Sequence, residues 1–77
     1  MENITIYTTK YCPYCLRAKA LLDEKGLSYT EIAVDQDDAQ RNKMMELSGR
    51  QTVPQIFFDK EHIGGYDDLY AYFKRQK

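Results

Sequence analysis

The amino-acid sequence predicts an α/β fold in which a mixed four-stranded sheet is flanked by three helices, in the order β-α-β-α-β-β-α. Two observations support this prediction. Apolar residues recur with the period of two that is typical of strands in some stretches and with the helical spacing in others, and the two kinds of stretch mostly alternate along the chain. The 77 residues have room for one core, so we expect a single domain over residues 1–77.

The first three elements are expected to form a βαβ unit. Ile4 and Ile6 alternate with more polar neighbours over residues 3–8, which is typical of a half-buried strand. Apolar residues at helical spacing follow over about residues 13–25, and strand character returns over residues 27–34. Such a connection predicts two parallel strands with a right-handed crossover.

A second helix is predicted over about residues 38–48. Asp37 followed by Gln40 fits a capping box at its start, and Gly49 is a typical helix end. The apolar contacts of this helix are expected from Met44, Met45 and Leu47.

A hairpin and a third helix complete the chain. Residues 55–58 and 61–63 predict two strands joined at Asp59 and Lys60. The last helix follows two glycines. Its packing side is expected to carry Leu69, Tyr70 and Phe73.

Composition excludes several classes of protein. With 43% apolar residues and a net charge of −1, the chain resembles a globular protein and offers no case for nucleic-acid binding. No apolar run approaches the roughly 20 residues that a membrane span needs, so no membrane association is expected. The first residues lack the basic and apolar segments of a signal peptide, and we therefore expect a cytoplasmic protein.

The two cysteines begin the first predicted helix. Pro13 suits the first turn of a helix, which makes Cys12 the expected N-cap. A sulfur there faces unpaired backbone N–H groups and the positive end of the helix dipole, which favour the charged thiolate. Cys12 is therefore predicted to be the nucleophile. Cys15 lies one turn further along and is predicted to be the resolving thiol.

Two other uses of the cysteines fit less well. A structural zinc site needs four ligands, whereas the chain adds only the distant His62 to its two cysteines, so no metal is expected. A structural disulfide between Cys12 and Cys15 would close a very small loop and would add little stability. A Cys-x-x-Cys that opens the helix of a βαβ unit favours redox chemistry.

Two further stretches are candidates for ligand binding. The Val53–Pro54 bond is either a cis bond, which would free the Val53 backbone to pair with an extended peptide, or part of a simple loop before a strand. The double glycine before the last helix would let a ligand approach the helix start, where N–H groups suit a carboxylate. Asp67 and Asp68 could receive an ammonium group or act as helix caps.

Three other side chains are considered for a functional role. Lys10 could stabilise the thiolate or hold a substrate carboxylate, or it could be an ordinary solvated lysine. The ring of Tyr14 could line a groove beside Cys12. His62 is interpreted as a surface or packing residue without chemistry.

Three motifs together resemble a dithiol glutaredoxin of the small bacterial type. They are Cys12-Pro13-Tyr14-Cys15, Thr52-Val53-Pro54-Gln55-Ile56-Phe57, and His62-Ile63-Gly64-Gly65 with Asp67-Asp68-Leu69. The resemblance implies a thioredoxin-like fold and glutathione as a co-substrate, with no permanently bound cofactor. It also implies reduction of protein disulfides and glutathione mixed disulfides, with Cys12 as the attacking thiol.

The resemblance also implies a glutathione groove. Val53 would pair through its backbone with the cysteine of glutathione, and the helix start at Asp67 would hold the γ-glutamyl end. The residues implied to line the groove are Lys10, Tyr14, Gln51, Thr52, Val53, Pro54, Gly65, Tyr66, Asp67 and Asp68.

Two positions depart from the family pattern. Many relatives have glycine in the hairpin turn at Lys60, and a non-glycine residue with positive φ there would cost about 1 kcal/mol. Many small relatives also have a third cysteine where this chain has Tyr66.

The expected partners are glutathione and disulfide-containing or glutathionylated proteins, with ribonucleotide reductase as one candidate, and the chain is expected to be a monomer. One alternative is an electron donor that thioredoxin reductase reduces. The other is a binding module in which two chains and two glutathiones hold an iron–sulfur cluster through Cys12. Pro13 disfavours this second alternative, because relatives that hold clusters usually have a small residue at that position.

Overall fold

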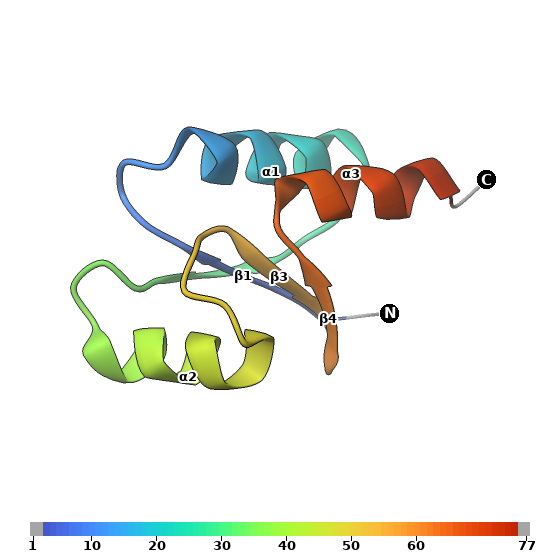
Figure 1. Ribbon diagram of the computed structural model, residues 1–77. Helices are drawn as coiled ribbons and strands as arrows, with labels where there is room; N and C mark the ends of the chain where they lie inside the picture. Colours follow the sequence, from blue (N-terminus) through green and yellow to red (C-terminus); the bar gives the residue numbers. More distant parts are fainter. Residues whose placement is uncertain (1–2, 76–77) are drawn as a thin grey trace.

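The computed structural model describes residues 3–75, so both ends of the domain predicted over residues 1–77 lie outside it. Seven elements follow one another in the predicted order (Figure 1). They are β1 (Ile4–Thr8), α1 (Pro13–Glu24), β2 (Thr30–Ala33), α2 (Asp38–Ser48), β3 (Gln55–Phe58), β4 (Glu61–Gly64) and α3 (Tyr66–Arg75). None of these helices is long and apolar enough to cross a membrane.

The four strands form one mixed sheet in the order β2-β1-β3-β4. β1 pairs parallel with β2 and antiparallel with β3, and β3 pairs antiparallel with β4, which confirms the βαβ unit and the hairpin. β2 is shorter than the predicted 27–34. Leu27 instead continues the end of α1, because its N–H donates to the carbonyl of Leu22 at 3.0 Å.

Helices cover both faces of the sheet. α1 and α3 lie side by side on one face, and α2 lies on the other (Figure 1). Ile4 and Ile6 pack towards α1 and α3, whereas Tyr7 packs with Met44 of α2. The expectation that the first strand is half-buried is therefore wrong. Tyr7 is only 3% exposed, because β1 is a central strand with helices on both faces.

Two helix contacts also differ from the prediction. In α3, Leu69 is buried and Phe73 packs against the core, as predicted. Tyr70, in contrast, is 52% exposed. Tyr72 packs against the core in its place, and its ring centroid lies 4.9 Å from that of Phe58. The inward stripe of α3 passes through the third and fourth residues after Leu69, which leaves Tyr70 outside it. In α2, Met44 is buried and Met45 is half-buried, whereas Leu47 is 53% exposed and lies beyond the packed face.

Local hydrogen bonds set the ends of α2. The Asp37 carboxylate accepts the Gln40 N–H at 3.1 Å, which is one half of the predicted capping box. The return bond is absent, because Gln40 Oε1 is buried without a partner among the described residues. Gly49 ends the helix in the left-handed conformation, with φ of 72°.

The residue with a left-handed backbone in the hairpin turn lies one position before Lys60. Asp59, and not Lys60, has a positive φ of 57°. Aspartate tolerates this conformation better than most residues. The turn is held to β1, because the Asn3 N–H donates to the Asp59 carboxylate at 2.9 Å and the Asp59 N–H donates to the Asn3 carbonyl at 2.7 Å.

Candidate active site

Cys12 is the N-cap of α1, as predicted. Its backbone is extended (φ −126°, ψ 104°), and Pro13 follows in the first turn. The Cys15 N–H donates to Cys12 Sγ at 3.2 Å. This hydrogen bond satisfies one of the N–H groups that a helix start leaves unpaired.

Cys15 is buried behind Cys12. Both thiols are free, and Cys15 is only 1% exposed. Burial, followed by its hydrogen bond to Cys12, raises the pKa of the Cys15 thiol to about 12. Cys12 is half-buried and is thus the sulfur that an outside disulfide can reach.

The loop before β3 lies against Cys12. The Val53–Pro54 peptide bond is cis, as the first of the two interpretations requires, and Pro54 directly precedes β3. The thiol of Cys12 donates to the Val53 carbonyl over 3.7 Å between sulfur and oxygen. The backbone of Val53 therefore stands directly beside the reactive sulfur.

Buried polar side chains hold this loop in place. Gln55 Nε2 donates to the Thr52 carbonyl at 2.9 Å, and Gln55 Oε1 lies 2.7 Å from His62 Nε2. His62 also packs on the ring of Phe57, with centroids 4.9 Å apart. Burial, helped by the nearby Arg50 charge, lowers the pKa of His62. The contacts of His62 thus agree with the packing role predicted for it, and they add Gln55 as a support that the sequence did not indicate.

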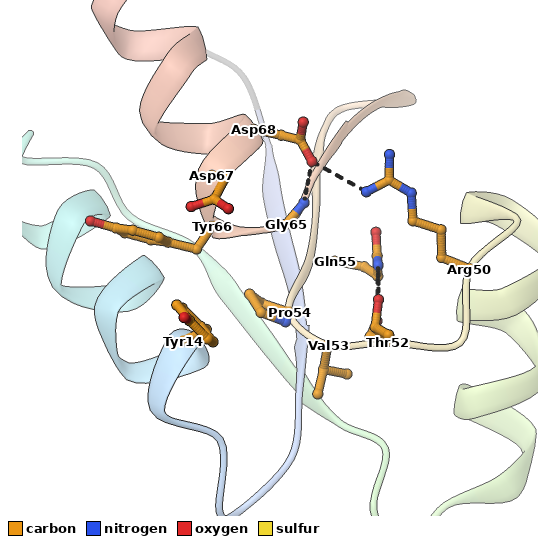
Figure 2. Close-up of a pocket in the computed structure, with 10 residues that line it drawn as sticks. All are labelled: Tyr14, Arg50, Thr52, Val53, Pro54, Gln55, Gly65, Tyr66, Asp67 and Asp68. Carbon is orange, nitrogen blue, oxygen red and sulfur yellow. Dashed lines mark hydrogen bonds and ion pairs between the residues drawn. The ribbon is translucent and has the colours of Figure 1, made fainter.

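An open groove of about 330 Å³ runs from Tyr14 on α1, past the cis proline, to the start of α3 (Figure 2). The rings of Tyr14 and Tyr66 lie 6.3 Å apart at one side of it. The lining residues are Tyr14, Arg50, Thr52, Val53, Pro54, Gln55, Gly65, Tyr66, Asp67 and Asp68.

The start of α3 offers N–H groups to this groove. The Gly65 carbonyl accepts the Leu69 N–H at 2.9 Å, which makes Gly65 the residue that precedes the first turn. The Gly65 N–H in turn donates to the Asp68 carboxylate at 3.0 Å. Glycine has no side chain to cap the next N–H groups of the helix, at Asp67 and Asp68, so these suit an anionic ligand.

Arg50 is a groove residue that the sequence analysis missed. Its guanidinium lies 3.2 Å from the Asp68 carboxylate, and both side chains are about half exposed (Figure 2). Asp68 accepts the Gly65 N–H and the Arg50 guanidinium, and these two contacts lower the pKa of its carboxyl group. The only sequence signal for Arg50 as a groove residue is its positive charge two residues before the Thr-Val-Pro stretch. The 18 positions between Arg50 and Asp68 give no local pattern that would predict their ion pair.

Two predicted groove residues lie elsewhere. Gln51 is exposed and does not line the groove. Lys10 lines a second cavity, of about 400 Å³, which both cysteines also line. Its backbone N–H donates to the Asp35 carboxylate at 3.1 Å, and its ammonium group lies 5.7 Å from the centroid of the Tyr11 ring.

No group of three or more His, Cys, Asp or Glu side chains in residues 3–75 is arranged to hold a metal ion.

A free cysteine pair at the start of the first helix of a βαβ unit, beside a cis proline and an open groove, defines a thiol–disulfide oxidoreductase with a thioredoxin-like fold. A profile described as Glutaredoxin matches residues 4–63. The chain belongs to the glutaredoxin family and is a glutathione-linked thiol oxidoreductase with a Cys-x-x-Cys dithiol.

Relatives and solved structures agree with this assignment. The chain is 59% identical to Glutaredoxin 3 of Escherichia coli K12 over 71 residues, which cover 92% of this chain and 86% of the relative. The solution structure of a Brucella melitensis glutaredoxin is 49% identical, with a TM-score of 0.84 over 97% of this chain and 82% of that one. The crystal structure of a buckwheat glutaredoxin–glutathione complex is 33% identical, with a TM-score of 0.88 over 99% of this chain and 72% of that one.

The Asp68 contacts predict an acid-sensitive stability. Because its pKa is lowered on folding, the charged carboxylate stabilises the protein above the unfolded pKa of about 3.9, and this contribution is lost as the pH falls through the lower folded value. Urea unfolding at pH 7 should show Asp68→Asn less stable by at most about 1 kcal/mol, since the ion pair is half exposed. The difference should shrink between about pH 4 and pH 2. An equal difference at both ends of this range would contradict the assignment.

Proposed function

We propose that this chain reduces protein disulfides and glutathione mixed disulfides, with Cys12 as the nucleophile and Cys15 as the resolving thiol. The observation that carries the proposal is the position of Cys12. It is the N-cap of α1, it contacts the Val53 carbonyl at the groove, and a buried Cys15 lies one turn behind it.

Glutathione is proposed to bind in the groove lined by Val53, whose carbonyl contacts Cys12. The Val53 backbone would pair with the cysteine residue of glutathione, and the first turn of α3 would hold the γ-glutamyl carboxylate. The carboxylate of Asp67 or Asp68, both of which line the groove, would receive the γ-glutamyl ammonium group. Lys10, on the other side of Cys12, is proposed to hold a substrate carboxylate. The structural similarity to a glutaredoxin in complex with glutathione supports this arrangement.

Two reactions follow from this arrangement. With a glutathionylated protein, the Cys12 thiolate attacks the glutathione sulfur, the protein thiolate leaves, and a second glutathione releases Cys12 as glutathione disulfide forms. With a protein disulfide, Cys12 forms a mixed disulfide with the protein, and Cys15 displaces the protein sulfur. Two glutathione molecules then reduce the Cys12–Cys15 disulfide.

The variant Cys15→Ser separates the two reactions. It should retain turnover of a small glutathione mixed disulfide, because that reaction needs only Cys12. It should lose most of the reduction of a protein disulfide, because no thiol remains to displace the protein. Both rates are measured with glutathione, glutathione reductase and NADPH. Equal loss of both reactions would contradict the division of roles.

The proposed electron source is glutathione, the proposed compartment is the cytoplasm, and the proposed state is a single-domain monomer. Ribonucleotide reductase is a proposed protein substrate. Replacing glutathione and its reductase by thioredoxin reductase in the same assay tests the electron source, and turnover should then fall to a small fraction of the glutathione-driven rate. Comparable rates from the two sources would overturn this part of the proposal.

A further inference from the structure

A second cavity lies behind the cysteine pair. It is separate from the groove lined by Val53 and the start of α3, and its lining includes Cys12, Cys15 and four charged side chains, Lys10, Lys19, Glu31 and Asp35. The proposed glutathione groove therefore does not account for the charged side chains that share this cavity with Cys15.

Glu31 and Lys19 form an ordered pair in this cavity. Glu31 Oε2 accepts the Thr8 hydroxyl at 2.7 Å and the Lys19 ammonium group at 3.0 Å. These two hydrogen bonds, from Thr8 and then from Lys19, lower the pKa of Glu31, and Glu31 in turn raises the pKa of Lys19. Both groups therefore stay charged at neutral pH, and Glu31 on the edge strand β2 fixes the position of the ammonium group on α1.

Lys19 stands next to Cys15 along α1. Side chains four residues apart lie one above the other on a helix, so Lys19 and Cys15 share one face of α1, and both line the same cavity. Cys12 precedes Lys19 by seven residues, which is about 10 Å along the helix axis. Lys19 lowers the pKa of Cys15, against the larger effects of burial and of Cys12.

We propose that Lys19, held in place by Glu31 and Thr8, is a positioning residue that promotes the resolving step by stabilising the thiolate of Cys15. This inference rests on the proposed dithiol reaction. It assigns a role to the Lys19–Glu31 ion pair, whose residues do not line the proposed glutathione groove.

In the resolving step, Cys15 replaces the partner sulfur on Cys12. The Cys15 thiol loses its proton to water in the open cavity, and the Lys19 charge stabilises the thiolate that remains. The thiolate attacks Cys12 Sγ of the mixed disulfide, a Cys12–Cys15 bond forms, and the bond from Cys12 to the partner sulfur breaks. The partner leaves as a thiolate and takes a proton from water. The enzyme dithiol is oxidised and the partner sulfur is reduced.

The test follows the conversion of the Cys12–glutathione adduct into the Cys12–Cys15 disulfide. The reduced protein is mixed with glutathione disulfide, quenched with acid at set times, and analysed by intact mass spectrometry. Loss of the Lys19 charge should lower the thiolate fraction of Cys15, and the higher nucleophilicity of the more basic thiolate offsets only part of this loss, so the conversion should slow about 3-fold. The turnover of a small glutathione mixed disulfide, which needs only Cys12, should fall by a smaller factor in Lys19→Met.

Two variants separate charge from packing. Lys19→Arg keeps the charge and can still bond to Glu31, and it should restore most of the wild-type rate. Lys43→Met removes an exposed cation of α2 and should convert at the wild-type rate. Added salt should narrow the gap between wild type and Lys19→Met, because it screens the charge.

A wild-type rate in Lys19→Met, or an equal loss in Lys19→Met and Lys19→Arg, would overturn the role of the Lys19 charge. A wild-type adduct that never converts would instead overturn the proposed dithiol reaction.

Discussion

The variant Cys12→Ser is expected to lose glutathione-dependent turnover by at least about 10³-fold. The hydroxyl of serine is not ionised at neutral pH and cannot form or exchange a disulfide, and Cys15 is too buried to attack an outside disulfide in its place. Turnover of a small glutathione mixed disulfide, coupled to glutathione reductase, measures the loss.

The fold should survive this change, so a loss of turnover in Cys12→Ser can be attributed to the missing thiol. Serine is one of the preferred N-cap residues, and its oxygen can accept the Cys15 N–H that Cys12 Sγ now accepts. The far-ultraviolet circular dichroism and the melting temperature of Cys12→Ser should therefore match those of the wild type. Retention of a tenth or more of the activity in a folded variant would show that Cys12 is not the nucleophile.

The variant Gly64→Ala is expected to lose about 2 to 4 kcal/mol of stability. Gly64 has a φ of 125°, which side-chain-bearing residues rarely adopt. A Cβ atom at this position would also lie 2.7 Å from Asp68 Cβ and would overlap its carboxylate. Asp68 would then have to leave the Gly65 N–H and Arg50, which form the end of the groove.

Gly26→Ala is the matched control for this substitution. Gly26 also has a positive φ, of 71°, but a Cβ there would meet nothing within 4 Å. It should cost only about 1 kcal/mol in urea unfolding and should leave the KM for glutathione unchanged. In Gly64→Ala the same KM should rise about 5-fold, as expected for about 1 kcal/mol of lost binding energy. Equal effects of the two substitutions would show that Asp68 does not couple stability to the groove.

Much of the site could be predicted because its parts are local. The Cys12 cap depends on Pro13 and on the N–H of Cys15, all within one helical turn. The carboxylate of Asp68 likewise bonds to the N–H of Gly65, three residues earlier. Helix capping involves residues at most four apart, so a pattern of neighbouring residue types is sufficient to indicate it.

The missed parts of the site join distant segments. Arg50 meets Asp68 across 18 positions, and Lys19 meets Glu31 across 12. Neither pair has a signal in the spacing of its residues, because the contact exists only after the sheet has set the position of each segment. Gln51, which the resemblance implies for the groove, is not among its lining residues, and sequence spacing gives no signal for this either, because it depends on how the loop packs.

The sequence by itself determined the order of the elements, the βαβ unit and the cysteine at a helix start. These follow from the periodicity of apolar residues and from capping, both of which act over a few residues. Only the tertiary structure decided that Tyr7 is buried on a central strand, that Tyr72 and not Tyr70 faces the core, and that the Val53 carbonyl meets Cys12. The physical reason is that each of these depends on which surface another segment covers, and burial is a property of the assembled layers.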